Sequence, residues 1–192
     1  MMEFGFVWWL DSSVRFVTPK IDTALNYAID NSVLFTVTTS SVEDFNMARQ
    51  TDTRTFHFLG EDVCKYRPYG EIWATAVLFH FDDVTRHIVK AWAICALNSD
   101  CIAPPGVLNK LHCDVNNKCD GRCHRFDQSV LGIILYRLFH ELDTYPTDLS
   151  LNDIYVIKRG SMVNYFESCK IVSLCMWHDR NREITKPYVC LV

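Results

Sequence analysis

Cysteine is the residue type that most constrains how this chain can fold. Nine cysteines occur in 192 residues, and six of them lie between residues 64 and 123. Cytosolic proteins rarely carry so many cysteines without metal or redox chemistry, whereas secreted domains pair them as disulfides. The sequence therefore favours a domain made for an oxidising compartment, with a cysteine-rich loop at residues 95–123 and, because the count is odd, at least one free thiol.

The spacing of the cysteines indicates which of them pair. Cys95 and Cys101 flank a short loop after a predicted helix, so we expect a local bridge between them. Cys113 is expected to pair with either Cys119 or Cys123, and the sequence leaves that choice open. All three lie close enough along the chain for the Cα separation of about 4.4 to 6.8 Å that a disulfide requires.

A zinc site is the alternative for this loop. Cys113, Cys119, Cys123 and His124 follow the spacing C-x5-C-x3-C-H. Structural zinc sites use C-x2–4-C and H-x3–5-H spacings, and a Cys and a His that are adjacent do not easily reach one metal. Disulfides are therefore the favoured interpretation.

Composition limits the class of protein. Hydrophobic residues make up 49% and charged residues 22%, the balance of a globular chain, and the length fits one domain. A net charge of -4 argues against a nucleic-acid binder, which carries a basic face. No stretch reaches the roughly 18 apolar residues of a membrane span, and Met1–Leu10 lacks the basic region of a secretory signal. The chain is thus either cytosolic, or its start lies outside this sequence.

The first third of the chain alternates strand and helix patterns. The apolar run 4–10 (FGFVWWL) predicts a strand buried on both faces of a largely parallel sheet. Ile21, Leu25 and Ala28 recur at helical spacing, with Asn31 closing that helix, and the β-branched segment 32–38 predicts a second strand. This order predicts an α/β fold.

Further strand and helix segments extend this pattern after a polar stretch at 39–55, where we expect a loop with a short helix. Residues 72–81 predict a strand, and a helix capped by Asp83 follows, carrying Val84, Ile88, Ala91, Trp92 and Cys95 on one face. A turn-rich connection spans 103–118. The clearest helix starts at Asp127 or Ser129, carries Leu131, Ile134, Leu135, Leu138 and Leu142, and ends at Pro146; residues 153–157 and 170–176 predict weaker strands.

Three positions carry side chains suited to a binding site. Asp11 ends a predicted buried strand, beside the hydroxyls of Ser12 and Ser13, where open α/β sheets bind ligands; the alternative is an acid that bonds its own turn. Asp127 and Gln128 begin the strongest helix, whose free N–H groups can bind polar ligands; the alternative is a plain N-cap. His178 is a possible metal ligand or base by residue type, with a surface position as the alternative.

Three segments, two of which include Asp11 and the Asp127–Gln128 pair, also suggest a family. GFVWWLDSSVRF, AWAICALNSDCIAPPG and CHRFDQSVLGIIL together resemble an invertebrate-expanded family of glycosyltransferase-like proteins. That family is similar to GT-A nucleotide-sugar transferases of the glycogenin and galactosyltransferase-like kind. The resemblance runs from about residue 5 to about residue 140, and more loosely to about 180.

The resemblance implies roles for individual residues. In GT-A enzymes a strand ends in an acidic D-x-D motif that binds Mn²⁺ and the sugar diphosphate, and here Ser13 replaces the second carboxylate. We accordingly expect one cleft, at the carboxyl edge of the sheet, that brings Asp11, Asp127 and His178 together. The implied roles are donor binding by Asp11, Ser12 and Ser13, catalysis by Asp127 and Gln128, and coordination of Mn²⁺ or another divalent cation by Asp11, Ser13 and His178.

These observations predict an α/β domain with an incomplete GT-A-like mixed sheet flanked by helices, spanning residues 1–192 as a single partial domain. The implied activity is transfer of a sugar from a nucleotide-diphosphate donor to a glycan or glycoprotein acceptor, in the Golgi lumen or outside the cell. A catalytically inactive secreted relative that binds carbohydrate or protein is the alternative, and the missing second Asp favours it. Since the acidic motif comes at Asp11, before a βαβ unit of roughly 30 residues could fit, we expect this chain to lack a nucleotide-binding part, a membrane anchor and transferase activity.

Overall fold

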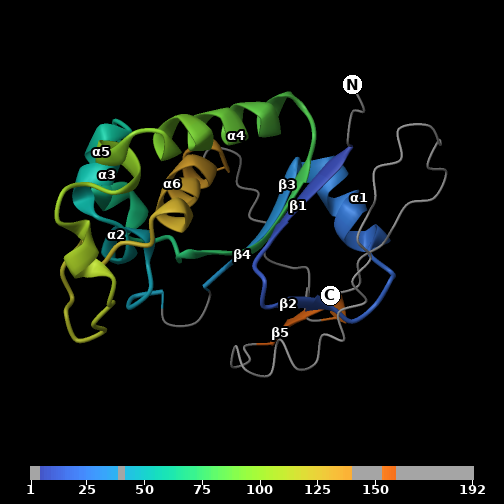
Figure 1. Ribbon diagram of the computed structural model, residues 1–192, viewed down its shortest axis with the longest axis horizontal. Helices are drawn as coiled ribbons and strands as arrows, with labels where there is room; N and C mark the ends of the chain where they lie inside the picture. Colours follow the sequence, from blue (N-terminus) through green and yellow to red (C-terminus); the bar gives the residue numbers. More distant parts are fainter. Residues whose placement is uncertain (1–4, 39–41, 140–152, 159–192) are drawn as a thin grey trace, which may run out of the picture. The chain divides into compact units, whose positions relative to one another are not determined.

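The computed structural model describes residues 5–38, 42–139 and 153–158 of the chain, and their helices and strands belong to one compact unit that ends at Ile157 (Figure 1). The strands are β1 (Phe6–Leu10), β2 (Val14–Phe16), β3 (Val33–Val37), β4 (Ile72–His80) and β5 (Tyr155–Ile157). The α-helices are α1 (Asp22–Asn31), α2 (Met47–Gln50), α3 (Thr53–Phe58), α4 (Asp83–Ala96), α5 (Ser99–Ile102) and α6 (Asp127–Phe139), and the 3₁₀ turns are η1 (Val63–Tyr66) and η2 (Val107–Lys110). The predicted α/β class is confirmed at this level.

The main sheet is antiparallel, and the prediction of a largely parallel sheet is wrong for the described strands. Its order is β1-β4-β3, with Phe6 opposite His80 at one end of the β1–β4 pair and Leu10 opposite Ala76 at the other. β3 also runs antiparallel to β4, with an irregularity between Leu34 and Thr36. The apolar runs were a poor guide to strand direction because antiparallel strands covered on both faces have the same composition as parallel ones.

Burial on both faces belongs to β3 and β4 rather than to β1. Among the described strands, β1 pairs only with β4, so it forms one edge of the sheet that they make, and its side chains alternate between partly buried and exposed. Val7 and Trp9 are each 46% exposed. The expectation that β1 is a fully buried strand is therefore wrong.

Two hydrophobic clusters cover the two faces of this sheet, and the ribbon shows α6 on one side of the strands and α1 on the other (Figure 1). On one face Val33, Phe35 and Ile72 pack with α2, α4 and α6 in the larger cluster. On the other face Leu34 and Leu78 pack with α1 and with residues of the small β2–β5 sheet. Helices that are far apart in the sequence therefore pack on the same sheet, whose central strand is β4.

Helix α4 begins with a capping box that the sequence places one residue too late. Asp82, not Asp83, is the N-cap: its Oδ1 accepts from the backbone N–H of Thr85 at 2.8 Å, and its own N–H donates to Thr85 Oγ1 at 3.0 Å. The buried positions include Ile88 and Cys95, with Trp92 half-buried beside them. Val84 and Ala91, which were expected on this face, are exposed.

Helix α6 is the best buried helix of the described chain. Nine of its residues are buried, including Leu131, Ile134 and Leu135, as the sequence predicts, whereas Leu138 is exposed. Gly132 allows the close approach of α2, because a Cβ there would lie 2.5 Å from Cε of Met47. The expected continuation through Leu142 to Pro146 and the strand at 170–176 lie outside the described residues.

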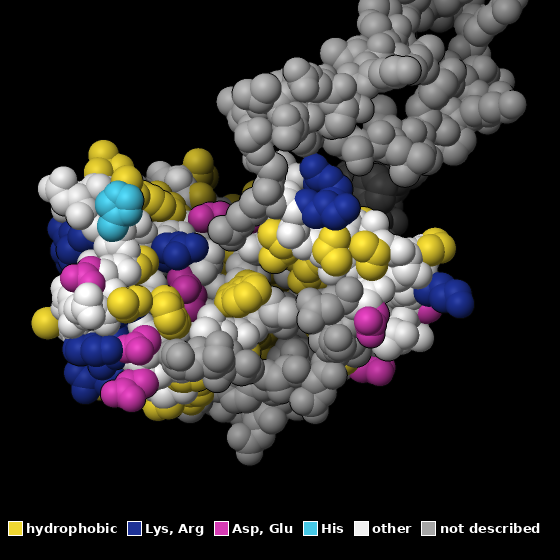
Figure 2. Space-filling model, turned by 90° about the horizontal axis from the view of Figure 1, so that it is seen from below, with side chains coloured by type: hydrophobic (Ala, Val, Ile, Leu, Met, Phe, Trp, Pro, Cys, Tyr) yellow, Lys and Arg dark blue, Asp and Glu magenta, His cyan; other side chains and the backbone are white. Residues whose placement is uncertain are grey.

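Within the described residues, no helix is long and apolar enough to cross a membrane. The face seen in Figure 2 shows hydrophobic side chains in small patches between acidic and basic ones. The exposed tryptophans, Trp9 and Trp73, lie on strands of the main sheet.

Candidate functional site

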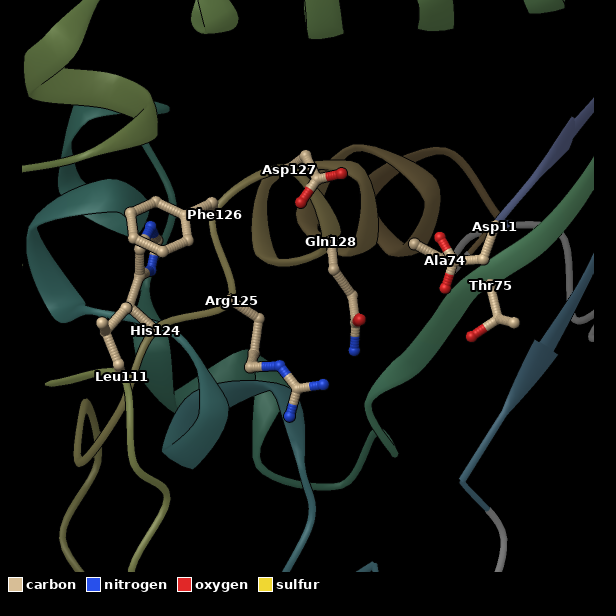
Figure 3. Close-up of a pocket in the computed structure, with 9 residues that line it drawn as sticks. All are labelled: Asp11, Ala74, Thr75, Leu111, His124, Arg125, Phe126, Asp127 and Gln128. Carbon is tan, nitrogen blue, oxygen red and sulfur yellow. The ribbon is translucent and has the colours of Figure 1, made fainter. Parts of the chain in front are cut away.

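A pocket of about 300 Å³ lies where the end of β1, the start of β4 and the start of α6 meet (Figure 3). Its volume is at the lower end of the range for small-molecule sites, which begins near roughly 300 Å³. The residues that line it are Asp11, Ala74, Thr75, Leu111, His124, Arg125, Phe126, Asp127 and Gln128. Asp11, Asp127 and Gln128 were three of the predicted site residues, and the structure brings them together.

Asp11 is held at the end of β1 by the neighbouring strand. Its backbone N–H donates to the carbonyl of Thr75 at 2.9 Å, and its own carbonyl accepts from the N–H of Val14 at 3.0 Å. This turn leaves the Asp11 side chain exposed at the pocket, across from Gln128 (Figure 3). Ser12 and Ser13 form the turn and are not among the described lining residues, so only one member of the expected donor-binding trio lies there.

The other side of the pocket is the first turn of α6 and the residues just before it. Phe126 has a φ of 47°, a left-handed conformation that is strained for a phenylalanine by about 1 to 3 kcal/mol. The N–H of Arg125 donates to Ser129 Oγ at 3.0 Å, and that hydroxyl donates to the carbonyl of Gln50 at 3.2 Å, which fixes this bend against α2. Asp127 is consequently the first residue of the helix rather than its N-cap, and its carboxylate is exposed at the pocket.

Glu71 contacts two of the pocket-lining residues, Arg125 and Gln128, and was missed in the sequence analysis. Its side chain is 9% exposed and its Oε1 lies 4.0 Å from Nε of Arg125. Burial raises the pKa of Glu71 to about 7, although the charge of Arg125 and a hydrogen bond from Gln128 act in the opposite direction. Among the described residues, Oε1 has no hydrogen-bond partner. The available signal was a carboxylate directly before the apolar run that forms β4.

The backbone around Glu71 explains why a carboxylate is buried there. Its N–H donates to the carbonyl of Phe45 at 2.8 Å, and its carbonyl accepts from the N–H of Thr38 at 2.8 Å. Gly70 precedes it, and a Cβ at Gly70 would lie 2.0 Å from the Thr38 carbonyl oxygen. Backbone hydrogen bonds therefore hold Glu71 between residues 38 and 45. Its side chain reaches Arg125 and Gln128. The side chains of Arg125 and Gln128 extend to the same side in Figure 3.

The cysteine-rich loop and the residue after it contribute Leu111 and His124 to the pocket lining, and two disulfides hold this part of the chain. Its disulfides are Cys95–Cys101, with a Cα separation of 5.3 Å, and Cys113–Cys123, with a separation of 5.0 Å. The first is the bridge predicted from spacing, and the second resolves the open choice. Cys119, which was counted among the disulfide cysteines, is free and exposed, so that part of the prediction is wrong.

His124 is a structural residue despite lying against the pocket. Its Nδ1 accepts from the backbone N–H of Asp52 at 3.2 Å, so its Nε2 carries the proton and donates to the carbonyl of Ile102 at 2.9 Å. Burial lowers the pKa of His124 and outweighs the opposing effects of the Ile102 carbonyl and the Asp52 carboxylate. A neutral ring with both nitrogens bonded is not available as a base.

The described residues do not form a metal centre on their own. No group of three His, Cys, Asp or Glu side chains that could hold a metal ion occurs among them. Asp11 supplies one carboxylate, Ser13 supplies at most a neutral hydroxyl, and hard divalent cations take six or more oxygen ligands. His178, the third predicted ligand, lies outside the described residues.

Comparison with known proteins adds no relative: no family model, no curated protein and no solved structure matches the chain. The pocket itself, with two carboxylates, an amide and a guanidinium around a small volume, is the evidence on which a function rests.

Proposed function

We propose that this pocket binds a sugar residue, and that the chain belongs to a glycosyltransferase-like protein that transfers a sugar from a nucleotide-diphosphate donor to a glycan or glycoprotein acceptor. The observation that carries the proposal is that Asp11 lines one pocket with Asp127 and Gln128, although they are far apart in sequence. We further propose an incomplete GT-A-like fold, and a place in the Golgi lumen or outside the cell, which the two disulfides support.

The chemistry of the lining residues suits a sugar. A pyranose ring presents several hydroxyl groups, each of which can donate one hydrogen bond and accept others. Carboxylates at Asp11 and Asp127 accept from hydroxyls, Arg125 donates, and the amide of Gln128 does both. A volume of about 300 Å³ suits one ring better than a whole nucleotide sugar.

The proposed roles follow from position. Asp127 and Gln128 orient the sugar from the first turn of α6, where the helix N-terminus favours polar and anionic groups. Asp11 holds the sugar from the opposite side, at the end of β1. Glu71 acts through Arg125 and Gln128, so it is a positioning residue that does not itself line the pocket.

A second candidate is a catalytically inactive relative that binds carbohydrate or a protein partner. The observation that favours it is the lack of a metal-binding trio among the described residues, together with Ser13 in place of a second carboxylate. This candidate keeps the sugar pocket and loses the diphosphate chemistry, which allows the two to be separated by experiment.

The test is calorimetry on the full chain with three titrants: MnCl₂ followed by UDP or GDP, the same nucleotides without metal, and free monosaccharides. Metal-dependent nucleotide binding supports the transferase and overturns the expectation that this chain lacks a nucleotide-binding part, whereas sugar binding alone supports the inactive relative. Asp127→Asn should weaken sugar binding by about tenfold, since a hydrogen bond to a charged group contributes about 1.5 to 3 kcal/mol. Asp83→Asn, in the first turn of α4, is the matched control and should leave binding unchanged. No binding of any titrant would reject both candidates.

A further inference from the structure

Two tryptophans that contact each other, Trp9 on β1 and Trp92 on α4, lie close to residues that line the pocket. Trp9 is 46% exposed although it lies in a strand, and Trp92 is half-buried on α4. Their rings meet edge to face, with centroids 5.5 Å apart and an interplanar angle of 71°. A half-exposed indole offers a flat apolar face together with a polar N–H, and tryptophan is enriched at interfaces for that reason.

The pair is connected to both acidic walls of the pocket. The indole N–H of Trp92 donates to the backbone carbonyl of Asp127 at 3.1 Å. Trp9 precedes Asp11 by two residues, and because side chains alternate along a strand, the two share one face at a spacing of about 7 Å. The tryptophan pair therefore borders the pocket where Asp11 and Asp127 line it.

This combination of surfaces fits a saccharide rather than a purely apolar ligand. A sugar ring has faces of C–H groups and an edge of hydroxyls. The negative face of an indole attracts the partly positive C–H hydrogens, while carboxylates and amides bind the hydroxyls. The pocket has room for one ring, so an adjoining ring of an oligosaccharide would extend past the pocket's edge.

We propose that Trp9 is a stacking platform for a second sugar residue, next to the ring held by Asp11, Asp127 and Gln128, so that the ligand is an oligosaccharide chain. Trp92, fixed by its hydrogen bond to Asp127 and by its packing on the core, keeps the Trp9 ring in place. A platform held in this way loses little freedom on binding. The inference rests on the proposed function, since it requires that the pocket itself takes a sugar.

The experiment compares each monosaccharide of a panel with its β-linked disaccharide, such as galactose with lactose and N-acetylglucosamine with chitobiose. Binding to the full chain is measured by calorimetry and by tryptophan fluorescence. For wild type we expect the disaccharide to bind more tightly. Trp9→Ala should weaken disaccharide binding by about tenfold, which equals about 1.4 kcal/mol, and should leave monosaccharide binding unchanged. Trp9→Phe, which keeps an aromatic face and the fold, should recover most of the disaccharide affinity.

Trp73 provides the matched control, because it is also 46% exposed on a strand of the same sheet but donates its indole N–H to Thr38 Oγ1 at 2.7 Å. Trp73→Ala should preserve the ratio of disaccharide to monosaccharide affinity. If Trp9→Ala and Trp9→Phe both preserve that ratio, or if wild type binds both sugars equally, the platform is rejected while the pocket stands. If wild type binds no sugar in the panel, both the platform and the proposed function are rejected.

Discussion

Two buried carboxylates, Asp52 and Glu71, each belong to a residue that contacts the segment leading into α6, at His124 and at Arg125 respectively. They differ in how many hydrogen bonds and charges surround them. Asp52 is fully buried, and its two oxygens accept from Nε and Nη2 of Arg54 at 2.8 and 2.9 Å and from Nζ of Lys110 at 2.8 Å. Glu71 has Arg125 at 4.0 Å and a hydrogen bond from Gln128, and one of its oxygens is left without a described partner.

The pKa values of the two carboxyls are shifted in opposite directions by this difference. For Asp52 burial would raise the pKa, but hydrogen bonds from Arg54 and Lys110 outweigh it and hold the pKa well below its usual range. For Glu71 burial outweighs the partners and raises the pKa to about 7. A buried carboxylate whose oxygens all accept hydrogen bonds from cations, such as Asp52, stabilises the fold. One with fewer partners, such as Glu71, destabilises the fold at high pH, where it is charged. The pKa of such a group is also sensitive to charges that bind nearby.

The largest effect expected from this comparison is that of Asp52→Ala. The change removes the N-cap of α3, whose Arg54 N–H it accepts at 3.0 Å, and leaves the Lys110 ammonium near the Gly121 carbonyl without its carboxylate. We expect a loss of about 3 kcal/mol in the free energy of unfolding, measured by urea denaturation at pH 7 with disulfides intact. The stabilisation from Asp52 should also disappear as the pH falls below the ordinary carboxyl value of 3.8, because its folded-state pKa is depressed.

Asp120 is the control for this prediction. It forms an exposed ion pair with Arg67 at 2.7 Å, and such pairs contribute little. Asp120→Asn should leave the midpoint of unfolding nearly unchanged. Equal effects of Asp52→Ala and Asp120→Asn would show that the buried bonds around Asp52 do not support the fold.

Glu71→Gln should act in the opposite direction and with a smaller effect. The folded-state pKa lies above the ordinary value of 4.5, so the wild type is most stable below pH 4.5 and loses stability as the pH rises to about 7. The shift corresponds to about 3 kcal/mol at pH 8, of which we expect the neutral amide to recover about 2 kcal/mol. Denaturation of both proteins at pH 4.5 and pH 8 checks this, with a gain only at the higher pH.

Glu61 is the matched control for Glu71. Its side chain is 8% exposed, close to the value for Glu71, but it lies 3.2 Å from Nε of Arg137 and 3.9 Å from Nζ of Lys65. Glu61→Gln should lower stability at pH 8, where Glu71→Gln raises it. A Glu71→Gln protein that is less stable than wild type at pH 8 would mean that Arg125 pairs with Glu71 as effectively as Arg54 pairs with Asp52.

The same contrast explains what the sequence could and could not predict. Strand and helix positions were predicted well where apolar spacing is strong, as in β4 and α6, and Asp11, Asp127 and Gln128 were identified because each ends or begins such an element. Strand direction was wrong, because composition does not encode the pairing partner. Glu71 and Asp52 were missed because burial of a carboxylate depends on contacts with residues far away in the chain, such as Arg125 and Lys110.

The smallest effect concerns Cys119, and it tests which cysteine closes the loop that begins at Cys113, three residues after Lys110. The disulfide Cys113–Cys123 closes this loop, and the N–H of His124, next to Cys123, donates to the Lys110 carbonyl at 3.0 Å. Cys119 lies within the loop, free and exposed. Cys119→Ser should therefore change the free energy of unfolding by less than about 0.5 kcal/mol, the usual range for surface substitutions.

Alkylation of the unreduced protein, followed by peptide mass spectrometry, should label Cys119 and the exposed Cys64 and leave Cys113 and Cys123 unlabelled. A protected Cys119 in a peptide linked to Cys113 would instead select the other pairing that spacing allows. Cys123 would then be free beside His124, and this bridge would no longer anchor the hydrogen bond from the His124 N–H to the Lys110 carbonyl.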